Sequence, residues 1–118
     1  MNPEQLVPPL KLCKQIPRGA FANSALVWWG MCVYPRIHPD GARYGEPYRR
    51  SGSFPAPTLA EILEEIDPSF DANITVTYHF GQWKVEHRHY PREGVGSDND
   101  NPATAALKLW LEVNRKEE

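Results

Sequence analysis

The feature that most constrains the fold is a stretch of alternating residues between positions 74 and 90. In its first half, isoleucine, valine, tyrosine and phenylalanine alternate with threonine and histidine, which is typical of a strand with one apolar face. A second alternating run follows Gly81-Gln82, and a glycine at the first central position fits a type II′ turn. The sequence therefore predicts a β-hairpin over 74–90 in which Phe80 pairs with Trp83.

Two helices are predicted from their capping signals. Thr58 and Glu61 form a capping box in front of a run with helical apolar spacing. Asn101 is a good N-cap and Pro102 a good first residue for a last helix that extends over about 103–114. We expect this last helix to bury one stripe against the sheet: Ala103, Ala106, Leu107, Trp110 and Leu111.

The first third of the chain contains a short predicted helix and a predicted strand. The helix lies between Pro9 and Pro17, because proline suits a helix start and prevents its continuation. Residues 25–34 are apolar on both alternating sets, which predicts one central strand covered on both faces. Cys13 and Cys32 have no metal-ligand spacing, and we expect both to be buried as small hydrophobic side chains.

These elements predict an α+β fold in the order α-β-α-β-β-α. A small antiparallel sheet of three or four strands, including the 74–90 hairpin, would be packed by helices. A chain of 118 residues fits one domain, here 1–118, with a long loop rich in Pro, Gly, Arg and Tyr at 35–57.

Composition narrows the classes of function. The net charge is −2, without the basic excess that duplex nucleic-acid binders usually show. The polar N-terminus lacks the features of a signal peptide, and no apolar run approaches the roughly 20 residues needed to cross a bilayer. We therefore expect a cytoplasmic protein without membrane contact.

The long loop carries the main candidate binding residues. Arginines and tyrosines alternate with glycine and serine there, and such side chains can pair with phosphate or stack on a base. The same composition fits a protein contact or an inert solvated loop. The candidates in this loop are Arg43, Tyr44, Tyr48, Arg49 and Arg50.

His87 and His89 form the second candidate site. Two histidines two positions apart on a strand point to the same side, and such pairs ligate zinc in some proteins. A metal site needs a further ligand that the sequence does not identify, so we predict no metal and no cofactor. No nucleophile motif, phosphate-binding loop or dinucleotide fingerprint appears in the chain, and an enzyme is therefore not predicted.

Two segments resemble a known group of proteins. They read FPAPTLAEIL over 54–63 and NPATAALKLWL over 101–111. Together they are similar to uncharacterised small proteins of bacteriophages and mobile elements of gut bacteria. The resemblance implies an accessory protein, of a kind that often acts by binding a host component or a small signal. We therefore predict a non-enzymatic binding protein with a protein partner, and a nucleotide or nucleic-acid binder that uses the Arg/Tyr-rich loop is the alternative.

Overall fold

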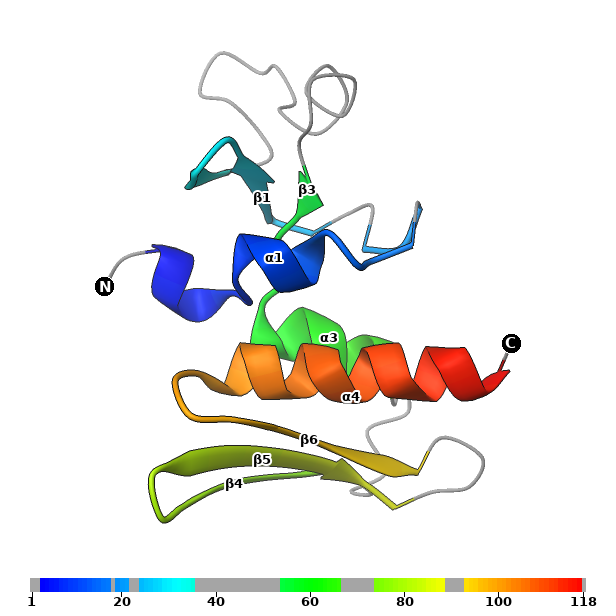
Figure 1. Ribbon diagram of the computed structural model, residues 1–118. Coiled ribbons are helices and arrows are strands. Elements are labelled where there is room, and N and C mark those ends of the chain that lie inside the picture. Colours follow the sequence, from blue (N-terminus) through cyan, green and yellow to red (C-terminus); the bar gives the residue numbers. More distant parts are fainter. Residues whose placement is uncertain are drawn as a thin grey trace. The chain divides into compact units, whose positions relative to one another are not determined.

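A computed structural model describes residues 3–17, 19–21, 24–35, 54–66, 74–88 and 93–117 (Figure 1). The chain divides into two compact units, Met1–Thr58 and Leu59–Glu118. Both units combine helix with an antiparallel three-stranded sheet, so the predicted α+β class is confirmed. The organisation as one domain stays a prediction.

The first unit consists of two short helical segments and a small sheet. The helical segments are η1, Pro3–Leu6, and α1, Leu10–Cys13. The sheet has the order β2-β1-β3 and is formed by β1, Leu26–Trp29, β2, Cys32–Pro35, and β3, Phe54–Pro55.

The expectation of one continuous strand over 25–34 is wrong. The segment is a hairpin with Gly30-Met31 at its turn, and Gly30 has a φ of 62° that glycine adopts without steric cost. The central place of β1 in its sheet is confirmed, but the strand is not covered on both faces. Trp28 is buried, whereas Trp29 is 36% exposed and Met31 in the turn is 82% exposed.

The carbonyl oxygen of Pro8 organises the core of the first unit. It accepts a hydrogen bond of 3.0 Å from the indole N–H of Trp28 and lies 3.5 Å from Sγ of Cys13. Burial raises the pKa of the Cys13 thiol to about 12, against a smaller lowering by its contact with Trp28. The prediction that both cysteines are buried holds for Cys13 and is wrong for Cys32, which is exposed.

The second unit is a three-stranded sheet with two helices on one side (Figure 1). The strands have the order β4-β5-β6, and α4 packs against β5, β6 and α3. The third strand, β6, is not among the elements that the sequence predicts. The elements are α3, Leu59–Ile66, β4, Ile74–His79, β5, Gln82–His87, β6, Gly94–Asp98, and α4, Pro102–Glu117.

The predicted start of the last helix is confirmed. Helix α4 begins at Pro102, and Oδ1 of Asn101 accepts a hydrogen bond of 2.7 Å from the backbone N–H of Thr104. The same oxygen accepts a bond of 3.0 Å from the Thr104 hydroxyl. Asn101 therefore satisfies a backbone donor that has no partner within the helix.

The hairpin of β4 and β5 is confirmed, but its turn lies one residue earlier than predicted. His79 pairs with Gln82, so the loop is Phe80-Gly81. Both loop residues have positive φ, 52° for Phe80 and 75° for Gly81, as a type I′ turn requires. The predicted pair Phe80–Trp83 is therefore wrong, and Trp83 pairs with Tyr78 instead. The residues that are in a strand in both registers keep their predicted face, because the partner moves by two positions.

Replacement of Phe80 tests this turn directly. The variant Phe80→Asn is expected to raise the free energy of unfolding by about 0.5–1 kcal/mol, because asparagine tolerates positive φ far better than phenylalanine. Phe80 is 94% exposed, so its removal gives up little packing. Urea unfolding followed by circular dichroism measures the change. An unchanged or lower midpoint would contradict the type I′ assignment.

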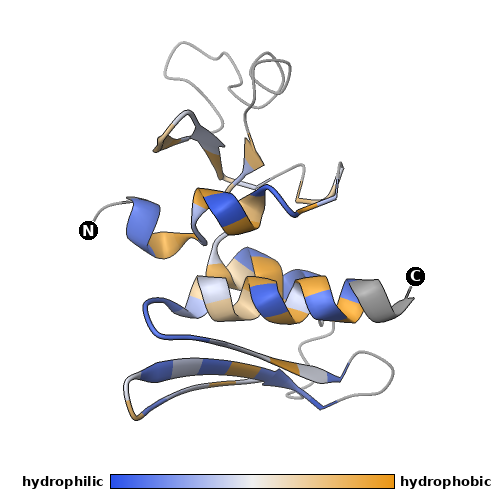
Figure 2. Ribbon diagram, viewed as in Figure 1, coloured by the Kyte–Doolittle hydropathy of each residue, from blue (hydrophilic) through white to orange (hydrophobic). Residues whose placement is uncertain are grey.

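Two glycines of β6 fix which face of the second sheet meets α4. A Cβ atom added to Gly94 would lie 2.9 Å from Cδ1 of Leu109, and one added to Gly96 would collide with the backbone of α4 at Ala105. The strand partners of these glycines, His87 and Val85, share their face and are buried. Hydrophilic and hydrophobic residues alternate along β5 (Figure 2), and the opposite face of the sheet, which we call the open face, is mostly polar. Its residues are Thr75, Thr77, His79, Gln82, Lys84, Glu86, Val95 and Ser97.

Helix α4 is buried on more of its circumference than the single predicted stripe of apolar residues would cover. Ala105 and Leu109 face β6, and both are fully buried. The burial of the predicted stripe is confirmed. Successive residues of an α-helix are rotated by about 100° around its axis, so Leu107 and Trp110 lie roughly 120–180° away from the side that contacts β6. The side of α4 that meets β6 was therefore predicted wrongly, since Ala105 and Leu109 lie outside the predicted stripe.

Asp98 joins the end of β6 to the start of α4. Its Oδ2 accepts hydrogen bonds from the backbone N–H groups of Asp100, at 2.9 Å, and Asn101, at 3.2 Å. Its Oδ1 lies 3.2 Å from Nζ of Lys108. Partial burial raises the pKa of Asp98, but the two N–H groups and the Lys108 ammonium together lower it below its ordinary value of 3.8.

This lowered pKa predicts a pH dependence of stability. The unfolded chain binds a proton at Asp98 at higher pH than the folded chain does, so the stabilisation is complete above pH 3.8 and is lost as pH falls through the folded pKa. We expect Asp98→Asn to flatten the loss of stability below about pH 4. Melting temperatures between pH 2.5 and 6 measure this slope, and a slope equal to that of the unmodified protein would contradict the role of Asp98.

Candidate functional site

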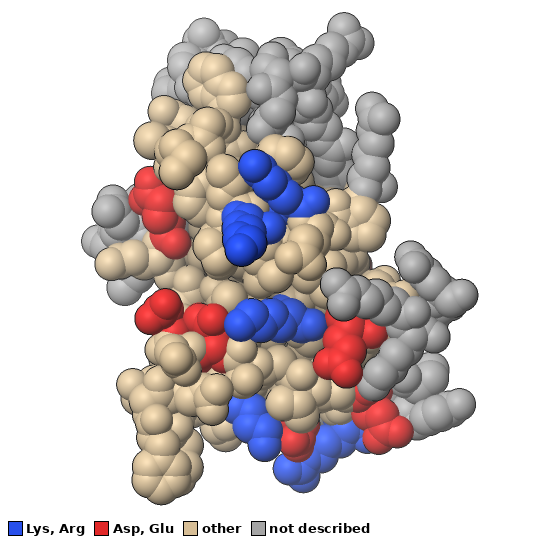
Figure 3. All heavy atoms as spheres, in the orientation of Figure 1, with Lys and Arg blue, Asp and Glu red and all other residues tan. Residues whose placement is uncertain are grey.

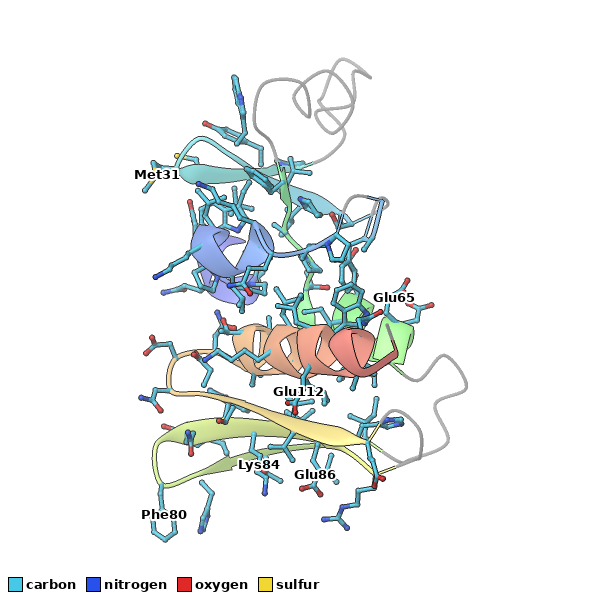
Figure 4. The ribbon with its side chains drawn as sticks, turned by 45° about the vertical axis from the view of Figure 1, so that its right-hand side comes forward. Met31, Glu65, Phe80, Lys84, Glu86 and Glu112 are labelled. Carbon is cyan, nitrogen blue, oxygen red and sulfur yellow. The ribbon has the colours of Figure 1, made fainter. Side chains whose placement is uncertain are left out.

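Four aromatic residues lie at the turn of the β4–β5 hairpin, and we call them the aromatic hairpin end. They are Tyr78, His79, Phe80 and Trp83. Tyr78 is 59% exposed, Phe80 is 94% exposed, and His79 is also exposed. Figure 4 shows Phe80 at the tip of the hairpin, where its ring points away from the sheet.

The rings of the aromatic hairpin end form two contacting pairs. Tyr78 and Trp83 are strand partners on the face toward α4, with ring centroids 4.9 Å apart. His79 and Phe80 meet edge to face with centroids 4.0 Å apart. Both separations are in or near the range of favourable aromatic pairs, so each exposed ring is supported by a neighbour. The aromatic hairpin end is therefore a preformed group of exposed rings at a two-residue turn.

Phe80 is a poor choice for stability at its position. A positive φ is unfavourable for a bulky residue, and such strain costs on the order of 1 kcal/mol. An exposed fraction of 94% leaves its ring almost no burial to offset that cost. A residue that is both strained and exposed is more common at binding and catalytic positions than elsewhere on a surface.

The charged side chains of the hairpin lie away from its turn, as Figure 4 shows for Lys84 and Glu86 relative to Phe80. On the open face, Nζ of Lys84 lies 3.6 Å from Oε2 of Glu86, and Nε of Arg88 donates to Oε1 of the same carboxylate. The hydrogen bond from Arg88 is the largest cause that lowers the pKa of Glu86. Figures 3 and 4 show that acidic and basic side chains intermingle over this part of the molecule. Lys84 and Arg88 exceed Glu86 by one positive charge, but the aromatic hairpin end itself contains no Lys, Arg, Asp or Glu.

The binding residues predicted in the long loop cannot be placed in the fold, and their role stays a prediction. The five candidates of the long loop, Arg43, Tyr44, Tyr48, Arg49 and Arg50, lie outside the described residues. The range 35–57 is a loop only in part, because Pro35 ends β2 and Phe54–Pro55 forms β3.

The two candidate histidines also stay without support as a pair. His87 lies in β5 opposite Ile74 and Gly94, and its side chain is 4% exposed. Its face is the one toward α4, so it offers little surface to a partner. His89 lies outside the described residues, and a binding role for the pair stays a prediction.

The described segments contain neither a cluster of metal-binding side chains nor a membrane-spanning helix. Within them, no group of three or more His, Cys, Asp or Glu side chains is placed to hold a metal ion. None of the helices that the structure describes is both long enough and apolar enough to cross a membrane.

The hairpin of the first unit also exposes an apolar turn residue. Met31 follows Gly30 at the β1–β2 turn and is 82% exposed (Figure 4). Beside it, the rings of Trp29 and Tyr34 lie 5.8 Å apart. Here the glycine carries the positive φ, so Met31 sits in the turn without the backbone strain of Phe80.

Sequence reasoning missed the aromatic hairpin end because it placed Phe80 in the strand. With the turn at Gly81-Gln82, Phe80 extends the apolar face and has a packing role. With the turn at Phe80-Gly81, the strands end at His79 and Gln82 and the phenylalanine loses that role. The signal that could have found it is the X-Gly pair, which is typical of type I′ turns and leaves X exposed.

Comparison with protein-family models, with curated proteins and with solved structures finds no match for this chain.

Proposed function

We propose that this protein is a non-enzymatic binding protein whose aromatic hairpin end contacts a protein partner. The observation that supports this proposal best is Phe80, which is strained by its positive φ and 94% exposed. Exposed aromatic side chains on a rigid element act as anchors that enter pockets of a partner. Tyr78 and His79 flank the anchor with groups that can form hydrogen bonds at its rim.

The chemistry of the hairpin favours a protein over a nucleic acid. A nucleic-acid surface combines aromatic rings with uncompensated positive charge. Here the aromatic hairpin end contains no Lys or Arg, the nearby Lys84 and Arg88 share the carboxylate of Glu86, and the whole chain has a net charge of −2. The partner pocket should therefore be apolar with a polar rim, in the manner of protein interfaces.

Two further parts of the proposal rest on the sequence. The resemblance of segments 54–63 and 101–111 to phage and mobile-element proteins favours a host component as partner, and the proposed location is the cytoplasm. Binding of a nucleotide or nucleic acid by the Arg/Tyr-rich loop remains the alternative. Retention of the protein on heparin at low salt would favour this alternative.

The test is capture of partners from a bacterial host lysate by wild-type protein and by Phe80→Asn. We expect the variant to lose a captured protein by about 10-fold or more, as for an interface anchor, although the same change stabilises the hairpin. Loss of binding together with a gain of stability excludes unfolding as the cause.

The matched control is Met31→Asn, which removes an exposed apolar turn residue from the other unit. It should capture the same proteins as the wild type. A photo-reactive phenylalanine analogue at position 80 should also crosslink the partner, and one at position 31 should not. Loss of capture with Met31→Asn alone would contradict the proposal and assign binding to the β1–β2 turn.

A further inference from the structure

Strand β4 is an edge strand without the usual protections against pairing. Among the described residues, β5 is its only strand partner, and all six positions pair in regular register without a bulge. Natural edge strands are commonly blunted by lysine, proline, bulges or short length. β4 reads ITVTYH and contains no lysine, no proline and no acidic residue.

The register identifies which backbone groups point outward from β4. A two-residue hairpin loop is closed by a hydrogen-bonded pair, here His79–Gln82, and such pairs alternate with non-hydrogen-bonded ones along the strands. The N–H and C=O groups of Thr75, Thr77 and His79 therefore point toward β5. Those of the other three residues point to the free edge: Ile74, Val76 and Tyr78.

The same three residues carry the apolar side chains of β4. They share the face of Val85, and that face lies toward α4. Ile74 and Val76 are half-buried, and Tyr78 is 59% exposed. Outward backbone groups and incompletely covered apolar side chains therefore occur at the same positions.

We propose that β4 pairs antiparallel with β4 of a second copy of this chain, with Val76 opposite Val76 of the second copy. This register places Ile74 opposite Tyr78 of the second copy and Tyr78 opposite its Ile74. Each of these pairs joins residues whose backbone groups point outward, so the three pairs form about six hydrogen bonds. The two sheets become one sheet of six strands, related by a two-fold axis.

The occupant is a second copy because the strand is complementary to itself. In the proposed register, apolar side chains meet apolar side chains on one face, and Thr75 meets Thr77 on the other, where threonines can hydrogen-bond across strands. β4 contains no acidic residue, lysine or arginine, so no like charges repel each other across the two-fold axis. The edge formed by β6 lacks this match, since it carries Asp98 and two glycines.

This self-association goes beyond the proposed function and does not depend on it. The two-fold axis passes near Val76, so the two copies of Phe80 lie at opposite ends of the joined strands. Phe80 is not part of the β4–β4 contact. The variant Phe80→Asn should therefore self-associate like the wild type even if it no longer binds the partner protein. The two proposals can thus fail independently of each other.

The first experiment is sedimentation equilibrium of the full chain over about 10 µM to 1 mM, concentrations that detect a weak contact of modest area. The mass is expected to rise from 13.5 kDa toward twice that value with concentration. Tyr78→Lys places a charged side chain opposite the apolar Ile74 of the second copy and adds a lysine of the kind that protects natural edge strands, so it should raise the dissociation constant about 10-fold or more. Val95→Lys, at a 42% exposed position of β6, is the matched control and should leave it unchanged.

The second experiment tests the register itself. In a Cys32→Ser background, which removes the exposed native thiol, Val76→Cys should form a covalent dimer on mild oxidation. His79→Cys should not, because the two copies of residue 79 lie roughly 20 Å apart in this register. A mass of 13.5 kDa at every concentration would overturn the proposal, as would equal crosslinking of both cysteine variants.

Discussion

Gly96→Ala is expected to lower the free energy of unfolding by about 3 kcal/mol or more. The added Cβ would collide with the carbonyl oxygen of Ala105 and would lie 2.7 Å from the amide nitrogen of Leu109. Both are backbone atoms of α4, which cannot rotate aside as a side chain can. The helix would therefore have to move away from β6.

Urea unfolding followed by circular dichroism measures this loss. Gly94→Ala is the matched control on the same strand and face, because its Cβ would meet only side-chain atoms of Leu109 and Val113. Those side chains can give way, so the control should lose clearly less, about 1–2 kcal/mol. An equal loss of unfolding free energy in the two variants would show that the backbone of α4 does not lie against Gly96.

The variant Trp110→Ala is expected to lower the free energy of unfolding by about 3–5 kcal/mol, because Trp110 is only 7% exposed and its removal leaves a large cavity. Alanine preserves the helix propensity of the position, so the loss reports packing and not helix formation. The effect should appear as a lower melting temperature with unchanged helix content in the folded state.

Glu112→Ala gives the comparison for this variant. Glu112 is an exposed residue of α4, and its replacement should change the free energy of unfolding by no more than about 0.5 kcal/mol. A Trp110→Ala protein as stable as Glu112→Ala would mean that the C-terminal helix contributes little to the core.

The parts of the fold that follow from local rules were predictable from the sequence. The N-cap at Asn101 and the start at Pro102 depend on side-chain chemistry within one helical turn, and both are confirmed. The 74–90 hairpin follows from alternation, which holds for either placement of its turn. Placement of the turn needed a choice between two glycine-containing pairs, and alternation alone does not distinguish registers that differ by two residues.

The parts that depend on contacts between distant residues were not predictable. Strand β6 has two glycines and weak alternation, and it forms a strand because α4 covers Gly94 and Gly96. The turn at Gly30-Met31 lies within an apolar run whose continuous hydrophobicity hides it. The aromatic hairpin end was missed for a related reason, since it exists only with Phe80 in the turn.

The backbone at Phe80 also has an evolutionary consequence. Because asparagine and glycine fit its left-handed conformation better than phenylalanine does, random substitution followed by selection for stability alone would remove the aromatic ring. A lineage in which the contact at Phe80 has become dispensable should therefore drift toward Asn-Gly or Gly-Gly at this turn. Related chains that retain an aromatic residue at this position should be those in which the partner is still present.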